Sequence, residues 1–202
     1  PASSAAHPRA AATPLQPPRA AGRGALGVAE ADAVVAVLPG SRRSEIEAIA
    51  PLFLQTVARL HQQRPGLRYL LPAAPGLHAM LAPLLAQLAP GAPLSLIEGR
   101  SHEVLAACDV TLIASGTATL EAALFKRPMV IAYRMNAWSW QIMSRMRLQP
   151  WVGPPNILCG AFVRPEVLQG DATPAPVAVA GVQWFHSPPP ARRGRARVSD
   201  VR

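Results

Sequence analysis

The sequence has few cysteines and none of the common arrangements of catalytic residues, and this argues against several classes of protein. The two cysteines, Cys108 and Cys159, belong to no Cys-x-x-Cys pair and no Cys/His cluster, so no zinc site is predicted. Two unpaired thiols fit a reducing compartment such as the cytosol. The chain also shows no Ser/His/Asp order and no paired carboxylates, which leaves hydrolase chemistry without support.

Long apolar runs and a signal peptide are missing as well. The most apolar stretch, residues 104–125, contains Asp109 and Glu121 and is interrupted at 115–117 by Ser-Gly-Thr. We therefore predict a helix end, a buried strand and a second helix there, not a membrane span. No signal peptide is visible, and the sequence starts at Pro1, so we expect a processed or truncated N-terminus.

The basic charge is carried almost entirely by arginine. Lys and Arg number 20 against 11 Asp and Glu, the formal charge is +9, and Lys126 is the only lysine. Arginine suits phosphate recognition, but a GC-rich genome also favours Arg, Ala and Pro together, and we favour that explanation for the ends. Nucleic acid is not a predicted partner, because these arginines lie in the tails without a nucleic-acid-binding motif. The arginines at the ends are Arg9, Arg19, Arg23, Arg192, Arg193, Arg195, Arg197 and Arg202.

Composition divides the chain into three parts. Residues 1–26 are rich in Pro, Ala and Arg and nearly lack large apolar side chains, so we predict a linker or disorder. Residues 27–174 carry strong apolar periodicity and are predicted to form one well-packed domain. Residues 175–202 begin as a further helix and continue as a basic, Pro/Arg-rich tail.

Short apolar runs alternate with helical periodicity in the middle part. This βαβ rhythm predicts an α/β fold, a Rossmann-like parallel sheet with helices on both faces. The helix after the first strand has Ser44 and Glu47 at capping-box spacing, and Pro51 predicts a kink or restart within it. The predicted strands are 33–38, 67–72, 94–97, 109–114 and 129–133, and the predicted helices after the first are 77–88, 102–107, 115–125, 136–148, 165–168 and 174–185.

Two loops at predicted strand ends have the chemistry of phosphate binding. Parallel sheets bind ligands at the carboxyl ends of their strands. Gly40-Ser41-Arg42 follows the first strand and offers close backbone approach, a hydroxyl and a guanidinium fork. Taken alone it is weak evidence, because a Gly/Ser-rich strand-to-helix junction is common in α/β proteins.

The second loop begins a helix. Ser115-Gly116-Thr117 precedes the helix that contains Glu121. A helix N-terminus offers free N–H groups and a positive dipole end to a diphosphate, and a carboxylate one or two turns on can accept hydrogen bonds from a ribose diol. The alternative is that Ser115 and Thr117 only cap the helix while Glu121 is solvated.

Four strings, in order, resemble one enzyme family. They are LPGSRRSEIEAIAPLFL, DVTLIASGTATLEAALFKRPMVIAYR, PPNILCG and RPEVLQGDATP, and with His7-Pro8 the likeness runs to about Pro174. They resemble the C-terminal half of the lipid-A-disaccharide synthase family. The resemblance implies the C-terminal domain of a GT-B fold, which binds the nucleotide sugar.

The resemblance also implies an activity and a set of binding residues. The family transfers 2,3-diacylglucosamine from its UDP derivative to 2,3-diacylglucosamine 1-phosphate, forming a β-1,6 bond with inversion. Metal and cofactor are not expected, since the helix dipole and arginine stabilise the leaving UDP. The donor-binding residues that the resemblance implies are Arg42, Ser115, Gly116, Thr117, Glu121 and Asn156 of the Pro-Pro-Asn turn. Gly40 and Ser41, from the chemistry of the first loop, complete the predicted donor site.

The chain departs from the family at both ends. The family's N-terminal domain supplies acceptor contacts and the general base, so the catalytic residues are unknown here and we expect no transferase activity from this chain alone. The stretch after Pro174 also differs from the family pattern. Two alternatives stay open: another UDP-N-acetylglucosamine GT-B enzyme, of the peptidoglycan transferase or 2-epimerase type, and an inactive nucleotide-binding fragment.

The segment from Tyr133 to Trp151 mixes aromatic, methionine and arginine residues. This pattern fits contact with an anionic membrane surface, and it fits a core or homodimer-interface helix equally. With the implied lipid substrates, it predicts a cytoplasmic, peripheral location on the inner face of the bacterial inner membrane. His102 lies at a strand-to-helix junction, which predicts a position near the nucleotide.

Overall fold

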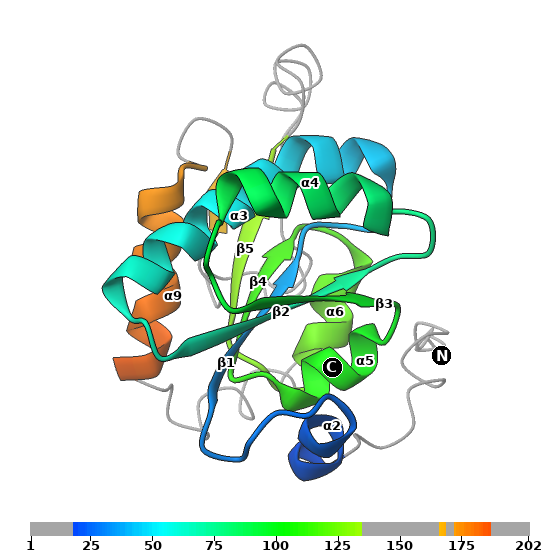
Figure 1. Ribbon diagram of the computed structural model, residues 1–202, viewed down its shortest axis with the longest axis vertical. Helices are drawn as coiled ribbons and strands as arrows, with labels where there is room; N and C mark the ends of the chain where they lie inside the picture. The colour runs from blue at the N-terminus through cyan, green and yellow to red at the C-terminus, as the bar shows by residue number, and fades with distance from the viewer. Residues whose placement is uncertain (1–17, 135–165, 169–171, 187–202) are drawn as a thin grey trace, which may run out of the picture.

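Six parallel strands form one sheet in the computed structural model, which describes residues 18–134, 166–168 and 172–186 (Figure 1). Across the sheet the order is β3-β2-β1-β4-β5-β6. The strand order therefore reverses between β1 and β4, as in doubly wound folds, which bind ligands outside the carboxyl ends of the strands at that point. The strands are β1 (Ala33–Leu38), β2 (Leu67–Ala73), β3 (Leu94–Glu98), β4 (Val110–Ala114), β5 (Met129–Tyr133) and β6 (Glu166–Leu168).

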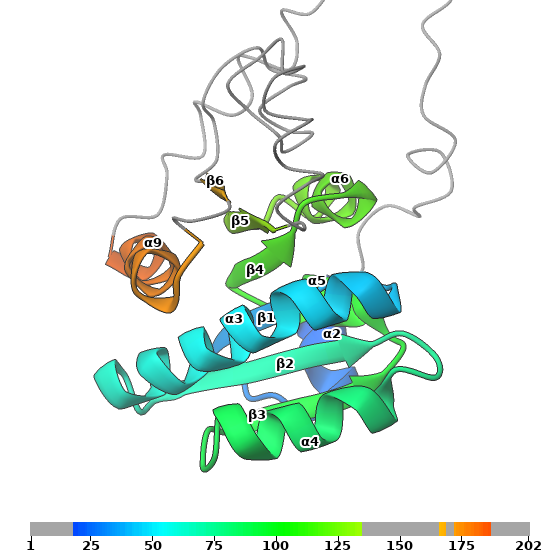
Figure 2. The same cartoon turned by 90° about the horizontal axis from the view of Figure 1, so that it is seen from above.

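Helices cover both faces of the sheet (Figures 1 and 2). Alternate residues of a strand point to opposite faces. Val35 and Val37 of β1 accordingly pack in the core with α3, α4 and α9, while Val34 and Ala36 pack in the core with α5 and α6. The α/β, Rossmann-like class predicted from the sequence is confirmed. The helices are α2 (Arg19–Ala25), α3 (Arg43–Gln63), α4 (His78–Leu88), α5 (Ser101–Ala107), α6 (Thr117–Leu124) and α9 (Pro174–His186).

Helix α3 is the longest of the described helices and supplies much of the core on its face of the sheet. Its apolar positions, among them Ile46, Phe53 and Val57, recur at helical spacing and are buried. Pro51 does not restart the helix, because the chain stays helical from Arg43 to Gln63. Proline lacks a backbone N–H, so the carbonyl of Glu47 has no helical donor at this position.

Three segments differ from the predictions made for them. Residues 19–25, within the range predicted to be a linker, form α2, which packs against α5. Residues 166–168, predicted as part of a short helix, form β6, because pairing with β5 outweighs the local preference of Pro165 for a helix start. The domain predicted to end at residue 174 extends further, because α9 begins at Pro174 and its Val177 and Ala178 belong to the core beside α3.

The burial of α2 depends on residues that a count of large apolar side chains overlooks. A Cβ added to Gly22 would lie 2.8 Å from the Cβ of Ala106, so this glycine allows close contact with α5. Arg23 is only 1 % exposed and makes hydrogen bonds with backbone carbonyls and the Asp109 carboxylate. The remainder of the predicted linker, the predicted helix 136–148 and the basic tail after 186 lie outside the described residues.

Candidate functional site

The two predicted ligand loops meet where the strand order reverses. Strands β1 and β4 are neighbours, with Leu38 paired to Ile113 at their carboxyl ends. The Gly40-Ser41-Arg42 loop follows β1, and Ser115 and Gly116 follow β4. The structure thus brings both loops to one edge of the sheet, while Asn156 lies outside the described residues.

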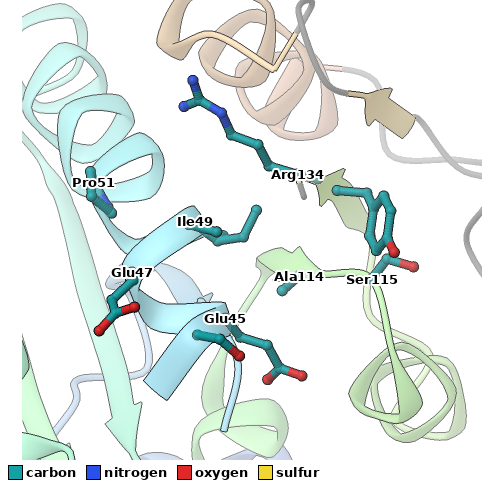
Figure 3. A pocket seen from close by; sticks show the side chains of 11 residues that line it. Glu45, Glu47, Ile49, Pro51, Ala114, Ser115 and Arg134 are labelled. Carbon is teal, nitrogen blue, oxygen red and sulfur yellow. The ribbon is translucent and has the colours of Figure 1, made fainter. Parts of the chain in front are cut away.

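A cleft of about 780 Å³ opens at this edge (Figure 3). Its walls come from the first turns of α3 and from the ends of β4 and β5. Its lining combines apolar side chains with carboxylates, hydroxyls and one guanidinium, so it can accept a ligand with both apolar and polar groups. The lining residues are Ser44, Glu45, Glu47, Ala48, Ile49, Pro51, Ala114, Ser115, Ala132, Tyr133 and Arg134.

The N-terminus of α6 has the features of an anion site. Its N-cap, Gly116, has φ 157° and ψ −166°, a backbone conformation that is essentially restricted to glycine. As glycine, the N-cap residue has no side chain to cap the helix, and the Thr119 hydroxyl donates to the Gly116 carbonyl. The first N–H groups of α6 and its dipole are directed toward the ligand edge.

Glu121 and His102 lie side by side near this helix start. The His102 Nε2 is 3.5 Å from the Glu121 Oε2, and the His102 ring lies against Phe125 with centroids 5.8 Å apart. The Glu121 side chain is partly buried, and His102 of α5 is its neighbour. His102 is the second residue of α5, which places it next to the carboxylate predicted to hold a ribose.

The Gly40-Ser41-Arg42 loop is folded around Glu45, a residue that the sequence reasoning did not single out. The Glu45 Oε2 accepts hydrogen bonds from the backbone N–H groups of Ser41 (2.8 Å) and Arg42 (3.2 Å). The Arg42 guanidinium donates to the Glu45 Oε1 at 3.2 Å. The helix therefore starts at the N-cap Arg42, whose backbone N–H is capped by Glu45 at N3, and not at Ser44 with Glu47 as the spacing predicted.

One ionisable group of the cleft has a shifted pKa. Burial raises the pKa of the Tyr133 phenol above its ordinary value, so the phenol stays neutral at physiological pH. In the described ranges, no three His, Cys, Asp or Glu side chains gather as metal ligands. Among the helices described there, none combines the length and hydropathy that a bilayer span requires.

The fold is that of a Rossmann-like domain of the GT-B glycosyltransferases. The *E. coli* ADP-heptose lipopolysaccharide heptosyltransferase II matches with a TM-score of 0.54 at 14 % identity, covering 80 % of this chain and 49 % of that one. The UDP-GlcNAc 2-epimerase of *Neisseria meningitidis*, solved with UDP-GlcNAc, matches at 0.55 and 14 % identity, covering 83 % and 40 %. At this identity the likeness concerns the fold alone.

The chain belongs to the lipid-A-disaccharide synthetase family, whose sequence model matches residues 5–188. It is 56 % identical over 179 residues to the lipid-A-disaccharide synthase of *Albidiferax ferrireducens*, covering 89 % of this chain and 46 % of that protein. The *Pseudomonas aeruginosa* (strain UCBPP-PA14) enzyme is 47 % identical over 172 residues, with 85 % and 46 % covered. The chain thus spans about half the length of these curated relatives.

Proposed function

We propose that this chain is the donor-binding part of a lipid-A-disaccharide synthase. The enzyme would transfer 2,3-diacylglucosamine from its UDP derivative to 2,3-diacylglucosamine 1-phosphate, with inversion and formation of a β-1,6 bond. One observation carries the proposal: in a chain of this family, the glycine-started N-terminus of α6 and the Arg42 loop both lie at the edge where the strand order reverses.

Each residue of the edge has a proposed role in holding UDP. The first N–H groups of α6, at Gly116 and Thr117, bind the diphosphate. Glu121 accepts hydrogen bonds from the ribose hydroxyls, and Arg42 stabilises the charge that develops on the departing UDP. These fixed donors and dipoles perform the task for which other transferases use a divalent cation, so no metal enters the proposal. Asn156 is assigned to the donor through the family resemblance.

The acceptor and the membrane belong to the same proposal. Both substrates are lipids, so we assign the protein to the cytoplasmic face of the bacterial inner membrane as a peripheral protein. The aromatic and basic segment at 133–151 is the proposed contact with anionic lipid, and its alternative use is a homodimer interface. A general base near the acceptor hydroxyl is needed for inversion, and no described residue is assigned that role.

Calorimetry with UDP tests the donor site. Replacement of Arg42 by alanine is expected to weaken UDP binding by about 1.5–3 kcal/mol, roughly 10- to 150-fold, the scale of a hydrogen bond to a charged group. The matched control is Arg43→Ala, which removes the same charge one residue further along and is expected to change the affinity little. Absence of UDP binding to the unaltered chain, or equal losses in both variants, would contradict the proposal.

A further inference from the structure

The position that an anion would take in the Arg42 loop is already filled by Glu45. Its Oε2 accepts hydrogen bonds from the backbone N–H groups of Ser41 and Arg42, and its Oε1 accepts one from the Arg42 guanidinium. Adjacent backbone N–H groups that converge on one point form a common binding place for anions. A phosphate oxygen and the Glu45 carboxylate cannot occupy that point together.

The loop is shaped for this carboxylate. Gly40 has φ 121°, which disfavours any side chain, and a Cβ there would lie 2.5 Å from the Glu45 Oε2 and 2.6 Å from the Glu45 Cβ. The Cβ of Glu45 is fixed by the backbone of α3, so it cannot move aside as the end of a flexible side chain can. The glycine, the two N–H groups and the carboxylate therefore form one unit with the first turn of α3.

The ion pair with Glu45 restricts an Arg42 side chain that is otherwise largely exposed to solvent. Arg42 is 80 % exposed and Glu45 34 % exposed. A free arginine loses rotamer entropy when it binds a ligand, and a neighbour that orients it beforehand reduces that cost. The guanidinium has five N–H donors, so an ion pair through Nη1 leaves others for a phosphate.

We propose that Glu45 is a positioning residue of the donor site, an inference that rests on the proposed function. Its carboxylate stays hydrogen-bonded to the backbone N–H groups of Ser41 and Arg42 when UDP binds, and it orients the Arg42 guanidinium toward the diphosphate. In this arrangement the loop contributes a side chain to phosphate binding, whereas α6 contributes backbone N–H groups. The opposite arrangement, in which UDP displaces Glu45 from the loop, would strip α3 of its capping carboxylate.

The two arrangements predict opposite signs for one substitution. Glu45→Gln keeps an oxygen that accepts the two backbone N–H groups, but it loses the ion pair with Arg42. It also removes a negative charge beside an anionic ligand, which by itself favours UDP. If Glu45 positions Arg42, UDP binding weakens by about 3- to 10-fold despite that charge change, a typical coupling between two contacting residues. If Glu45 is displaced by UDP, binding tightens.

Calorimetry of a double-mutant cycle supplies the test. UDP affinity is measured for the unaltered chain, Glu45→Gln, Arg42→Ala and the double variant, with uridine as a ligand that has no phosphate. We expect Glu45→Gln to weaken UDP but not uridine, and to have no such effect once Arg42 is alanine. Thermal unfolding of each variant reports separately on the capping of α3.

Glu47→Gln is the matched control, since Glu47 lines the same cleft and the substitution removes the same charge. It should leave UDP affinity unchanged or slightly higher. Unchanged or tighter UDP binding in Glu45→Gln, or an equal loss in the Arg42→Ala background, overturns the inference. The donor site itself would survive that result as long as Arg42→Ala still weakens UDP, so the two failures are distinguishable.

Discussion

Arginine is used in opposite ways at the two edges of the sheet. At the amino edge, Arg23 is 1 % exposed, and its guanidinium donates to acceptors in residues 29–32 and 107–109. At the carboxyl edge, Arg42 is 80 % exposed and pairs with Glu45. The acceptors of Arg23 are the carbonyls of Ala29, Glu30, Asp32 and Ala107 and the carboxylate of Asp109.

The difference separates a stabilising arginine from one available to a ligand. The guanidinium of Arg23 makes its hydrogen bonds within the chain, including one to the carbonyl of Ala107. Arg127 donates to the carbonyls of Leu105 and Ala106, so the two arginines together satisfy the last carbonyls of α5. Arg42, by contrast, keeps donors without partners among the described residues. Both lie in a chain with 20 basic residues, so charge alone does not tell them apart.

The largest expected effect is the loss of stability when Arg23 is replaced. Arg23→Ala removes a buried charge that pairs with Asp109 and donates to four backbone carbonyls, and breaking a buried ion pair typically costs about 3–5 kcal/mol. Chemical denaturation measures the free energy of unfolding. Arg19→Ala is the control, because Arg19 pairs with the same Asp109 from a partly exposed position and should cost about 1 kcal/mol or less. Equal losses in the two variants would remove the contrast between the edges.

A smaller effect is expected at Glu121, on UDP binding rather than on stability. Glu121→Gln exchanges a charged acceptor for a neutral one, so UDP should bind about 1 kcal/mol more weakly while pyrophosphate, which has no ribose, is unaffected. Competition binding with both ligands measures the difference. Glu103→Gln is the control, since Glu103 pairs with Arg100 on α5 and has no proposed contact with the ligand. If UDP and pyrophosphate lose the same affinity, Glu121 does not recognise the ribose.

The smallest effect concerns an exposed pair at the amino edge. A hydrogen bond from Arg68, at 2.8 Å, lowers the pKa of the Asp32 carboxyl. Because the folded pKa lies below the unfolded one, the pair stabilises the fold above the unfolded pKa, and this contribution is lost as the pH falls through the folded pKa. Arg68→Gln should therefore lower stability slightly at neutral pH, and the difference should vanish in acid. Denaturation at a series of pH values checks this; a difference that persists in acid would point to another role for Arg68.

Much of the fold could be predicted from the sequence because the inner strands β1, β2, β4 and β5 are buried on both faces. Runs such as 33–38 and 129–133 consist of apolar residues between turn signals, and both are strands in the structure. Helix α2 could not be read in this way, since its burial uses Gly22 and Arg23, two residue types that usually indicate exposure or flexibility. Strand β6 has only three residues and depends on pairing with β5.

The two loops of the candidate site could be predicted from the sequence, but the side-chain contacts around them could not. Glycine and a hydroxyl after a strand indicate a ligand edge, and the structure places the Arg42 and Ser115 loops after the carboxyl ends of the neighbouring strands β1 and β4. The partner of Arg42 was not predicted, because Glu45 and Glu47 both lie near the helix start, and only the position of the N-cap decides which carboxylate reaches the loop. Likewise, the contact between His102 and Glu121 joins two helices whose relative placement is a tertiary feature.

The most direct test of the account is to map where UDP binds, residue by residue. Titration of the isotopically labelled 202-residue chain with UDP, followed by amide chemical shifts, compares the two edges in one experiment. We predict shifts concentrated at residues 40–45 and 115–121 at the carboxyl edge, and none at residues 23–32 and 105–109 at the amino edge. Shifts centred on the amino edge, or an unperturbed carboxyl edge at saturating UDP, would contradict the assignment of this edge as the donor site.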